Sequence, residues 1–304
     1  MLYSFLISFV DTYSFLNVFK YLTVRTGLAM FTSMVIVFIV GTPFIKYFSY
    51  KQIHNPIRKD GPEEHIIKKI GTPTMGGLLI LLGLFSGIFL WGDLLNPFNW
   101  FLIFILLSFG LLGAYDDIKK IKTKNSAGLS SKTKLILQII LALVGISILS
   151  YLADPVDLKK LYVPFFKDIM INLGWFFIPF YLFVIVGSSN AVNLTDGLDG
   201  LATGCSGIVF YGLGTEILIK EQQELIVFSI LCFSMSGICL GFLKYNSYPA
   251  KIFMGDTGSL SIGAILASIA LLTNSVFTLL IFSGIFIIES LSVIIQVGFF
   301  KITK

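Results

Sequence analysis

Five aspartates lie at the ends of long apolar segments of this 304-residue chain: Asp116, Asp117, Asp196, Asp199 and Asp256. A carboxylate beside hydrocarbon is costly, so such residues usually have a function. Carboxylate oxygens are ligands that Mg²⁺ prefers, and Mg²⁺ in turn binds phosphate groups. The aspartates, with lysines close to several of them, therefore indicate a metal site that acts on a phosphorylated substrate.

The first group is the string Asp116-Asp117-Ile-Lys-Lys120, which ends an apolar segment. Neighbouring residues on a helix point about 100° apart, so we expect the two carboxylates to divide the work. One would face a metal and the other a reacting group. Lys120 and Lys124 are four residues apart and would present two ammonium groups toward phosphates on one helix face. A solvated helix end is the alternative interpretation of an isolated Asp-Asp pair.

The second group is the string NAVNLTDGLD at 190–199, which is rich in amides and carboxylates. Asp196 and Asp199 are three residues apart, so they share one face of a helix. Asn190 and Asn193 repeat that spacing just upstream. This density of polar groups suits a nucleotide base, a ribose or a hydrated Mg²⁺. A capping turn is the alternative, but it accounts for one or two of these residues rather than four.

Two glycine-bearing turns complete the set of candidate residues. Asp256 lies between glycines at the start of an apolar segment, where it could ligate Mg²⁺ or cap a helix. Asn246 lies in the turn before it. The string GTPTMGG at 71–77 contains Thr74, and Lys69 lies two residues before the string. Backbone N–H groups at a helix start, with these two side chains, predict an anion site there. Glycines that serve only helix packing are the alternative.

Membrane helices must position these side chains. The chain is 56% hydrophobic and 13% charged, against about 25% charged in soluble proteins. We therefore expect one all-α, membrane-embedded domain over residues 1–304, a polytopic helix bundle rather than a barrel. Residues 1–25 are predicted to form an external interfacial helix, before a bundle over 26–304. Nine spans are predicted, at 26–48, 74–91, 99–115, 134–153, 172–189, 200–219, 225–243, 259–273 and 277–300.

The distribution of basic residues predicts the orientation of the bundle. Sixteen of the 22 Lys and Arg residues fall in loops on one side, and six on the other. The richer side should be cytoplasmic, which puts the N-terminus outside and the C-terminus inside. All five aspartates then lie at cytoplasmic ends of spans, with a substrate from the cytoplasm. An ion-coupled transporter is the rival class, but it would place its carboxylates near the midplane.

Together these strings resemble the phospho-N-acetylmuramoyl-pentapeptide transferase family, within the polyprenyl-phosphate N-acetylhexosamine-1-phosphate transferase superfamily. The resemblance covers about residues 21–304. It is carried by GTPTMGG at 71–77, DDIKK at 116–120, GLSSKTK at 128–134, NAVNLTDGLDGLA at 190–202 and FMGDTGSL at 253–260. Branches of the superfamily that transfer other sugars are similar around the aspartates but lack this form of the first and fourth strings.

The resemblance implies a reaction and its partners. Phospho-MurNAc-pentapeptide would pass from UDP-MurNAc-pentapeptide to undecaprenyl phosphate, giving lipid I and UMP in peptidoglycan synthesis. The family implies Mg²⁺ as cofactor, a homodimer in the bacterial cytoplasmic membrane, and no nucleic-acid partner. Transfer of another UDP-sugar phosphate is the alternative reaction. Direct attack by the lipid phosphate, with Asp116 orienting or deprotonating it, is the expected route, and a covalent aspartyl-phosphate is its rival.

By matching position, the resemblance assigns roles to individual residues. Asp256 is implied as the Mg²⁺ ligand, and Asp116 and Asp117 as catalytic carboxylates of the same metal site. The implied substrate-binding and phosphate-binding positions are Lys69, Thr74, Lys120, Lys124, Lys132, Asn190, Asn193, Asp196, Asp199 and Asn246. The family continues with a loop of three histidines and a tenth span, whereas this sequence stops at Lys304. An inactive, shortened homologue is therefore a further alternative.

Overall fold

Long apolar helices make up most of the computed structural model, which describes residues 2–54, 71–124, 127–153, 158–163, 170–220 and 225–303. Within these ranges, eight helices are long and apolar enough to cross a membrane. They are α2 (Leu22–Tyr50), α5 (Pro97–Thr123), α6 (Ser131–Leu152), α8 (Phe177–Thr195), α9 (Leu201–Ile219), α10 (Ile226–Asn246), α11 (Gly255–Leu272) and α13 (Gly284–Ile302). A shorter apolar helix, α4 (Gly77–Trp91), packs among them. The predicted all-α membrane bundle is confirmed.

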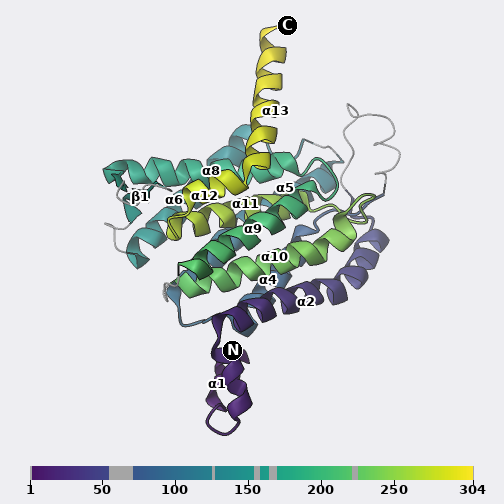
Figure 1. The fold of residues 1–304 in the computed structure, drawn as a ribbon. Coiled ribbons are helices and arrows are strands. Elements are labelled where there is room, and N and C mark those ends of the chain that lie inside the picture. The colour runs from purple at the N-terminus through teal and green to yellow at the C-terminus, as the bar shows by residue number, and fades with distance from the viewer. Residues whose placement is uncertain are drawn as a thin grey trace.

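Helix α11 is, with α10, one of the two most enclosed membrane helices that the structure describes. Every residue from Thr257 to Leu271 is buried, and the helix packs against α4, α5, α8 and α9 (Figure 1). A helix that is apolar on all sides is expected to lie inside a protein. Its serines satisfy their hydroxyls locally, as Ser261 and Ser268 do by donating to carbonyls of the preceding turn. Its first turn, which carries Asp256, is therefore held from several sides.

Glycines let two helices reach the backbone of that first turn. A Cβ added to Gly113 of α5 would lie 2.1 Å from Asp256 O. A Cβ added to Gly77 of α4 would lie 2.1 Å from Gly258 N. Small residues at membrane helix interfaces permit such close backbone approach. The start of α11 is consequently packed backbone to backbone against both α4 and α5.

The last predicted span, 277–300, is wrong as one continuous helix. The segment forms α12 (Val276–Phe282) and then α13, with a break at Ser283. Ser283 Oγ donates to Leu279 O at 2.5 Å, and Gly284 follows, which together interrupt the helix. Figure 1 shows α13 pointing away from the other helices, and Phe286 is its one buried residue. Hydropathy predicted the apolar character of this segment but not its direction.

The N-terminal region also differs from the prediction. Residues 1–25 were expected to form one interfacial helix, but the described part contains α1 (Leu2–Ser8) and a 3₁₀ helix, η1 (Ser14–Lys20). Helix α2 already begins at Leu22. Inside it, Arg25 is buried, donates to Trp91 O at 2.9 Å and lies 3.5 Å from the centre of the Tyr3 ring. These contacts attach α1 to the end of α4.

A short antiparallel hairpin and a further 3₁₀ helix lie between α6 and α8. Strand β1 (Lys160–Tyr162) pairs with β2 (Met170–Asn172), with Leu161 opposite Ile171. The 3₁₀ helix η2 (Gly174–Phe176) then leads into α8. The hairpin lies at the opposite end of α6 and α8 from the polar strings identified in the sequence.

Candidate active site

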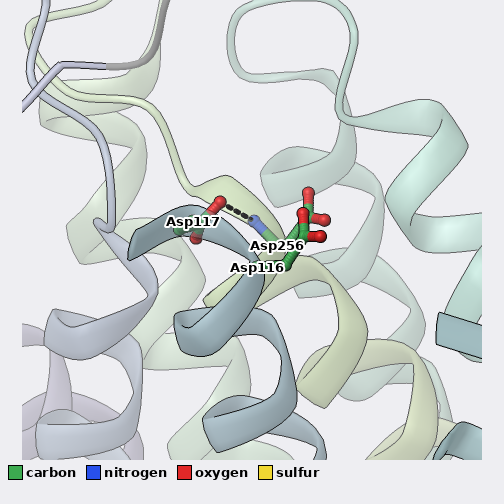
Figure 2. A group of neighbouring side chains, drawn as sticks. All are labelled: Asp116, Asp117 and Asp256. Carbon is green, nitrogen blue, oxygen red and sulfur yellow. Dashed lines mark hydrogen bonds between the residues drawn. The ribbon is translucent and has the colours of Figure 1, made fainter. Parts of the chain in front are cut away.

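Three carboxylates from two helices meet where α5 ends and α11 begins. Asp116 and Asp117 lie near the C-terminal end of α5, and Asp256 is the second residue of α11 (Figure 2). One oxygen from each side chain lies within 4.8 Å of the other two. Asp116 and Asp117 are buried, and the Asp256 side chain is 13% exposed. The structure thus brings together the three residues for which a shared metal site is predicted.

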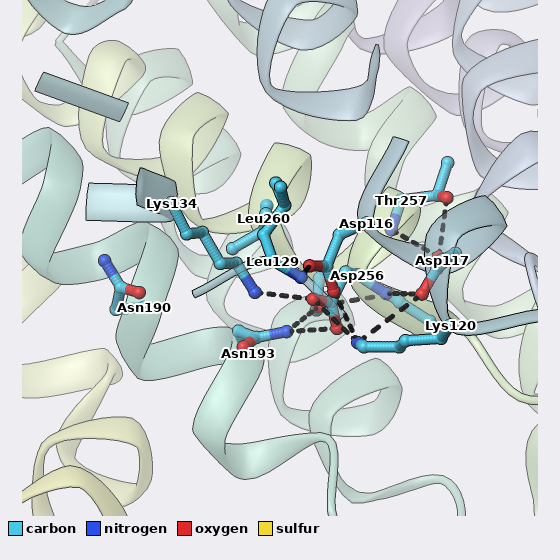
Figure 3. A network of polar contacts seen from close by, with 12 residues as sticks. Asp116, Asp117, Lys120, Leu129, Lys134, Asn190, Asn193, Asp256, Thr257 and Leu260 are labelled. Carbon is cyan, nitrogen blue, oxygen red and sulfur yellow. Dashed lines mark hydrogen bonds and ion pairs between the residues drawn. The ribbon is translucent and has the colours of Figure 1, made fainter. Parts of the chain in front are cut away.

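Asp117 is bound to the first turn of α11. Its Oδ1 accepts a hydrogen bond from Asp256 N at 3.2 Å, and its Oδ2 accepts from Thr257 N and Thr257 Oγ1 at 3.0 and 2.8 Å (Figures 2 and 3). The first N–H groups of a helix lack partners within the helix and favour negative charge. Asp117 therefore caps α11 from a different helix, which fixes its orientation.

Asp116 is held by the turn that joins α5 to α6. Its Oδ1 accepts a hydrogen bond from Leu129 N at 2.6 Å. Gly128 has a φ of 57°, and a Cβ there would lie 2.6 Å from the same oxygen, so only glycine fits. Ser130 then caps α6 by accepting from Thr133 N at 3.1 Å. The string GLSSKTK thus folds over Asp116 and starts the next helix.

Two lysines neutralise part of the carboxylate charge (Figure 3). Lys120 Nζ lies 2.6 Å from Asp116 Oδ2 and 3.1 Å from Asp256 Oδ2. The same nitrogen is 3.8 Å from Asp117 Oδ1. Lys134 Nζ lies 2.5 Å from Asp256 Oδ2, so two ammonium groups share that oxygen. Such a cluster of opposite charges can bind both a cation and phosphate oxygens.

The sequence prediction missed Lys134 and named Lys132 instead. Because α6 begins at Ser131, two residues apart on this helix point in different directions, and Lys132 is exposed while Lys134 points at the carboxylates. Lys124, also predicted, is exposed at the end of α5. The signal for Lys134 was Gln138, a buried polar residue four positions later on the same helix face.

Asn193 belongs to the cluster, whereas Asn190 lies one turn away from it. Asn193 Nδ2 donates to Asp256 Oδ1 at 3.0 Å and to Ser259 Oγ at 2.8 Å. Asn190 Nδ2 donates to Gln138 Oε1 at 2.8 Å, and Gln138 Nε2 lies 3.5 Å from Asn190 Oδ1. This amide pair joins α8 to α6 beside the carboxylates. Asn190 thus takes part in a contact between helices, and its predicted contact with substrate stays a prediction.

Asp199 and Asn246 hold the turn between α10 and α11. Asp199 Oδ2 accepts a hydrogen bond from Ala250 N at 3.1 Å. Asn246 is buried, accepts from Thr203 Oγ1 at 2.7 Å and donates to Ile252 O at 3.0 Å. Both side chains thus order the segment that leads to Asp256. Their predicted role on the nucleotide side stays a prediction.

The anion site predicted at the start of α4 is wrong in one respect. Gly76 N donates to Phe253 O at 2.9 Å, and Gly77 N donates to Met254 O at 2.8 Å. These N–H groups are used to join the string GTPTMGG to the string FMGDTGSL, so they are not available to an anion. The two strings together form the turn before Asp256.

Three predicted substrate positions remain. Thr74 is fully buried, and its Oγ1 would lie 3.1 Å from a Cβ added to Gly255, so it lies beside the residue that precedes Asp256. Asp196 is partly exposed at the C-terminal end of α8. Lys69 lies outside the described residues.

The fold and the cluster define a multi-pass membrane protein with a carboxylate and lysine site at one end of its helix bundle. Comparison with known proteins narrows this class. Residues 99–274 match the model of glycosyl transferase family 4, which is more than half of the chain.

Named relatives extend the match over the full chain. A phospho-N-acetylmuramoyl-pentapeptide-transferase of Pelagibacter ubique (strain HTCC1062) is 59% identical over 315 positions, which cover 100% of this chain and 87% of the relative. A protein of the same name from Prochlorococcus marinus (strain MIT 9312) is 58% identical, and the match covers 86% of this chain and 72% of the relative. Another from Thermodesulfovibrio yellowstonii is 46% identical, and the match covers 100% of this chain and 87% of the relative. The chain therefore belongs to the phospho-N-acetylmuramoyl-pentapeptide-transferase family within glycosyl transferase family 4, as its motifs predicted.

Proposed function

We propose that this chain transfers phospho-MurNAc-pentapeptide from UDP-MurNAc-pentapeptide to undecaprenyl phosphate, releasing UMP and forming lipid I. The observation that carries the proposal is the cluster of Asp116, Asp117 and Asp256 with two lysines, at the end of a membrane helix bundle in a member of this family. One substrate is a water-soluble sugar nucleotide and the other is a lipid. A polar site at the end of membrane helices is where both can meet.

We further propose that the three carboxylates hold Mg²⁺. The donor set suits this ion, because it consists of hard carboxylate oxygens within 4.8 Å of one another. Opposite ligands of Mg²⁺ lie about 4.2 Å apart when its bonds are about 2.1 Å long, so small movements of the side chains would bring all three oxygens within bonding distance of one ion. When bound, Mg²⁺ supplies neutralisation of the negative charge that the diphosphate develops as UMP leaves.

Among the three carboxylates, Asp116 is the one that we assign to orienting the lipid phosphate. A phosphate monoester has a second pKa of about 6, so this nucleophile is mostly ionised at neutral pH and needs orientation more than a strong base. An oxygen of the lipid phosphate attacks the β-phosphorus, and the bond from that phosphorus to the oxygen shared with UMP breaks. Lys120 and Lys134 are placed to contact phosphate oxygens during this step.

The hydrogen bonds of Asp117 argue against that residue as a covalent nucleophile. Both of its oxygens accept hydrogen bonds from the first turn of α11, which reduces their nucleophilicity and their freedom to move. A covalent route would then run through Asp116 or Asp256, each of which has an oxygen that contacts a lysine ammonium able to move. Radiolabel from the sugar nucleotide retained on the protein in the absence of undecaprenyl phosphate, and lost in Asp116→Asn, would favour that rival.

The test of the proposed function uses purified protein in lipid nanodiscs. With UDP-MurNAc-pentapeptide, undecaprenyl phosphate and Mg²⁺, we expect UMP and a lipid-linked product in equal amounts. Asp256→Asn should lower this rate at least about 10³-fold. Asp93→Asn is the matched control, because Asp93 is exposed at the far end of α4 and asparagine can still accept its hydrogen bond from Leu95 N. Full activity of Asp256→Asn would remove the cluster from the reaction.

The same assay separates the rival functions. A faster rate with another UDP-sugar would favour that substrate, and no product with any of them would favour an inactive homologue. Accumulation of a solute in proteoliposomes without a lipid-linked product would favour a transporter. We also propose that the site faces the cytoplasm, in a homodimer. Labelling of the variant Lys122→Cys with a membrane-impermeant thiol reagent, in intact and in opened cells, tests the orientation, because Lys122 is exposed.

A further inference from the structure

Lys120 makes contact with the whole carboxylate cluster. Its Nζ lies 2.6 Å from Asp116 Oδ2, 3.1 Å from Asp256 Oδ2 and 3.8 Å from Asp117 Oδ1. Lys134, by contrast, contacts Asp256 alone among the three. The ammonium of Lys120 therefore binds the same three side chains that would ligate a metal ion, and one of its partner oxygens is shared with Lys134.

A divalent ion and this ammonium compete for the same oxygens. In bulk water, a divalent ion and a unit positive charge about 4 Å apart repel each other enough to weaken binding about 30-fold, and the effect grows with burial. The Lys120 side chain is only 16% exposed. Its long aliphatic stem permits its charged end to move without displacing the helix. Occupation of the cluster by a divalent ion thus requires the ammonium to move away.

Charge balance indicates where the ammonium goes. Three carboxylates and two lysines sum to one negative charge around the cluster. With a divalent ion added, the sum becomes one positive charge, which attracts an anion. A displaced lysine head beside the ion is then suited to a phosphate oxygen.

We propose that Lys120 exchanges with the divalent ion: metal binding displaces its ammonium from the carboxylates, and the displaced ammonium then binds a substrate phosphate. This inference rests on the metal site of the proposed function. It makes metal binding and phosphate binding mutually favourable, because each favours the displaced position of Lys120. Lys120 is thus a competitor of the metal in the absence of phosphate and a ligand of phosphate in its presence.

The test measures metal affinity directly. Binding of Mn²⁺ to purified protein is followed by the loss of the electron paramagnetic resonance signal of free Mn²⁺. Lys120→Met keeps most of the length of the side chain and removes its charge, so we expect Mn²⁺ to bind about tenfold more tightly or better. Lys122→Met is the matched control, an exposed lysine two residues away on α5, and should bind Mn²⁺ as the wild type does. Lys120→Gln provides a second neutral variant if Lys120→Met is poorly folded.

Two further measurements complete the design. UDP-MurNAc-pentapeptide should tighten Mn²⁺ binding to the wild type, and this gain should be smaller in Lys120→Met. The variant should form product more slowly despite its higher metal affinity. Equal or weaker Mn²⁺ binding by both neutral variants overturns the exchange and leaves the proposed function intact. A wild type that binds no Mn²⁺ and forms product without divalent ions overturns the metal site itself.

Discussion

The contact between α5 and the first turn of α11 makes Gly113 a sensitive position. A Cβ at Gly113 would lie 2.1 Å from Asp256 O and 2.3 Å from Asp256 C. Non-bonded heavy atoms are normally about 3.5 Å apart, so the two backbones must separate by about 1 Å in Gly113→Ala. Because main-chain atoms cannot rotate out of the way, this separation moves Asp256 away from the pair on α5.

The size of the effect follows from that displacement. A misplacement of about 1 Å among reacting groups can lower a rate about 10²-fold, and overpacking costs about 1–3 kcal/mol of stability. We therefore expect Gly113→Ala to form lipid-linked product about 100-fold more slowly and to unfold at a lower temperature. Release of UMP by monodisperse protein in nanodiscs measures the first effect, and a thermal unfolding curve measures the second.

Gly110→Ala is the matched control on the same helix. Its Cβ would lie 3.2 Å from Leu81 Cδ1, the end of a side chain that can rotate, and 3.7 Å from Thr257 O. We expect nearly normal activity, since alanine also favours the helix over glycine by up to about 1 kcal/mol. Activity of Gly113→Ala above about one third of the wild type would refute the argument. Equal losses in both variants would assign the effect to the helix in general.

Two further predictions concern α6. Lys134→Met should lower product formation at least about 100-fold, whereas Lys132→Met should change it less than about threefold, because of these two lysines Lys134 alone contacts Asp256. Equal rates would contradict the assignment. Gln138→Leu or Asn190→Leu alone should cost about 1–3 kcal/mol by leaving one buried amide unpaired, and the double variant should cost less than the sum, as a chemical unfolding series would measure. Additive losses, or a product rate that falls only in Asn190→Leu, would return Asn190 to substrate binding.

Hydropathy predicted most helices because the length of an apolar run and the length of a span are set by the same bilayer. The predicted span at 200–219 became α9, Leu201–Ile219. The same reasoning failed at 277–300, because composition carries no information on direction and the break depends on Ser283 and Gly284. Residues 1–25 failed for a similar reason, since aromatic content does not specify helix continuity.

The motifs predicted which carboxylates meet but not how their neighbours are used. Asp117 and Asp256 are 139 residues apart, and only their strings indicated a common site. Lys134 was missed because its direction depends on where Ser130 caps α6, a choice that spacing alone leaves open. The pairing of Asn190 with Gln138 was not predicted, because spacing does not show that one helical turn, about 5.4 Å, separates a residue in the cluster from one paired with another helix.

The adjacent aspartates explain how the cluster can be both rigid and open to a cation. Asp117 accepts its hydrogen bonds from the first turn of α11, and its distance from Lys120 is the longest of the three. It therefore sets the spacing between α5 and α11. Asp116 and Asp256 instead direct oxygens at the ammonium groups of lysine side chains, which can move. A cation can take those oxygens while the link through Asp117 stays intact. Two neighbouring residues that point in different directions thus separate the fixed part of the site from the exchangeable part.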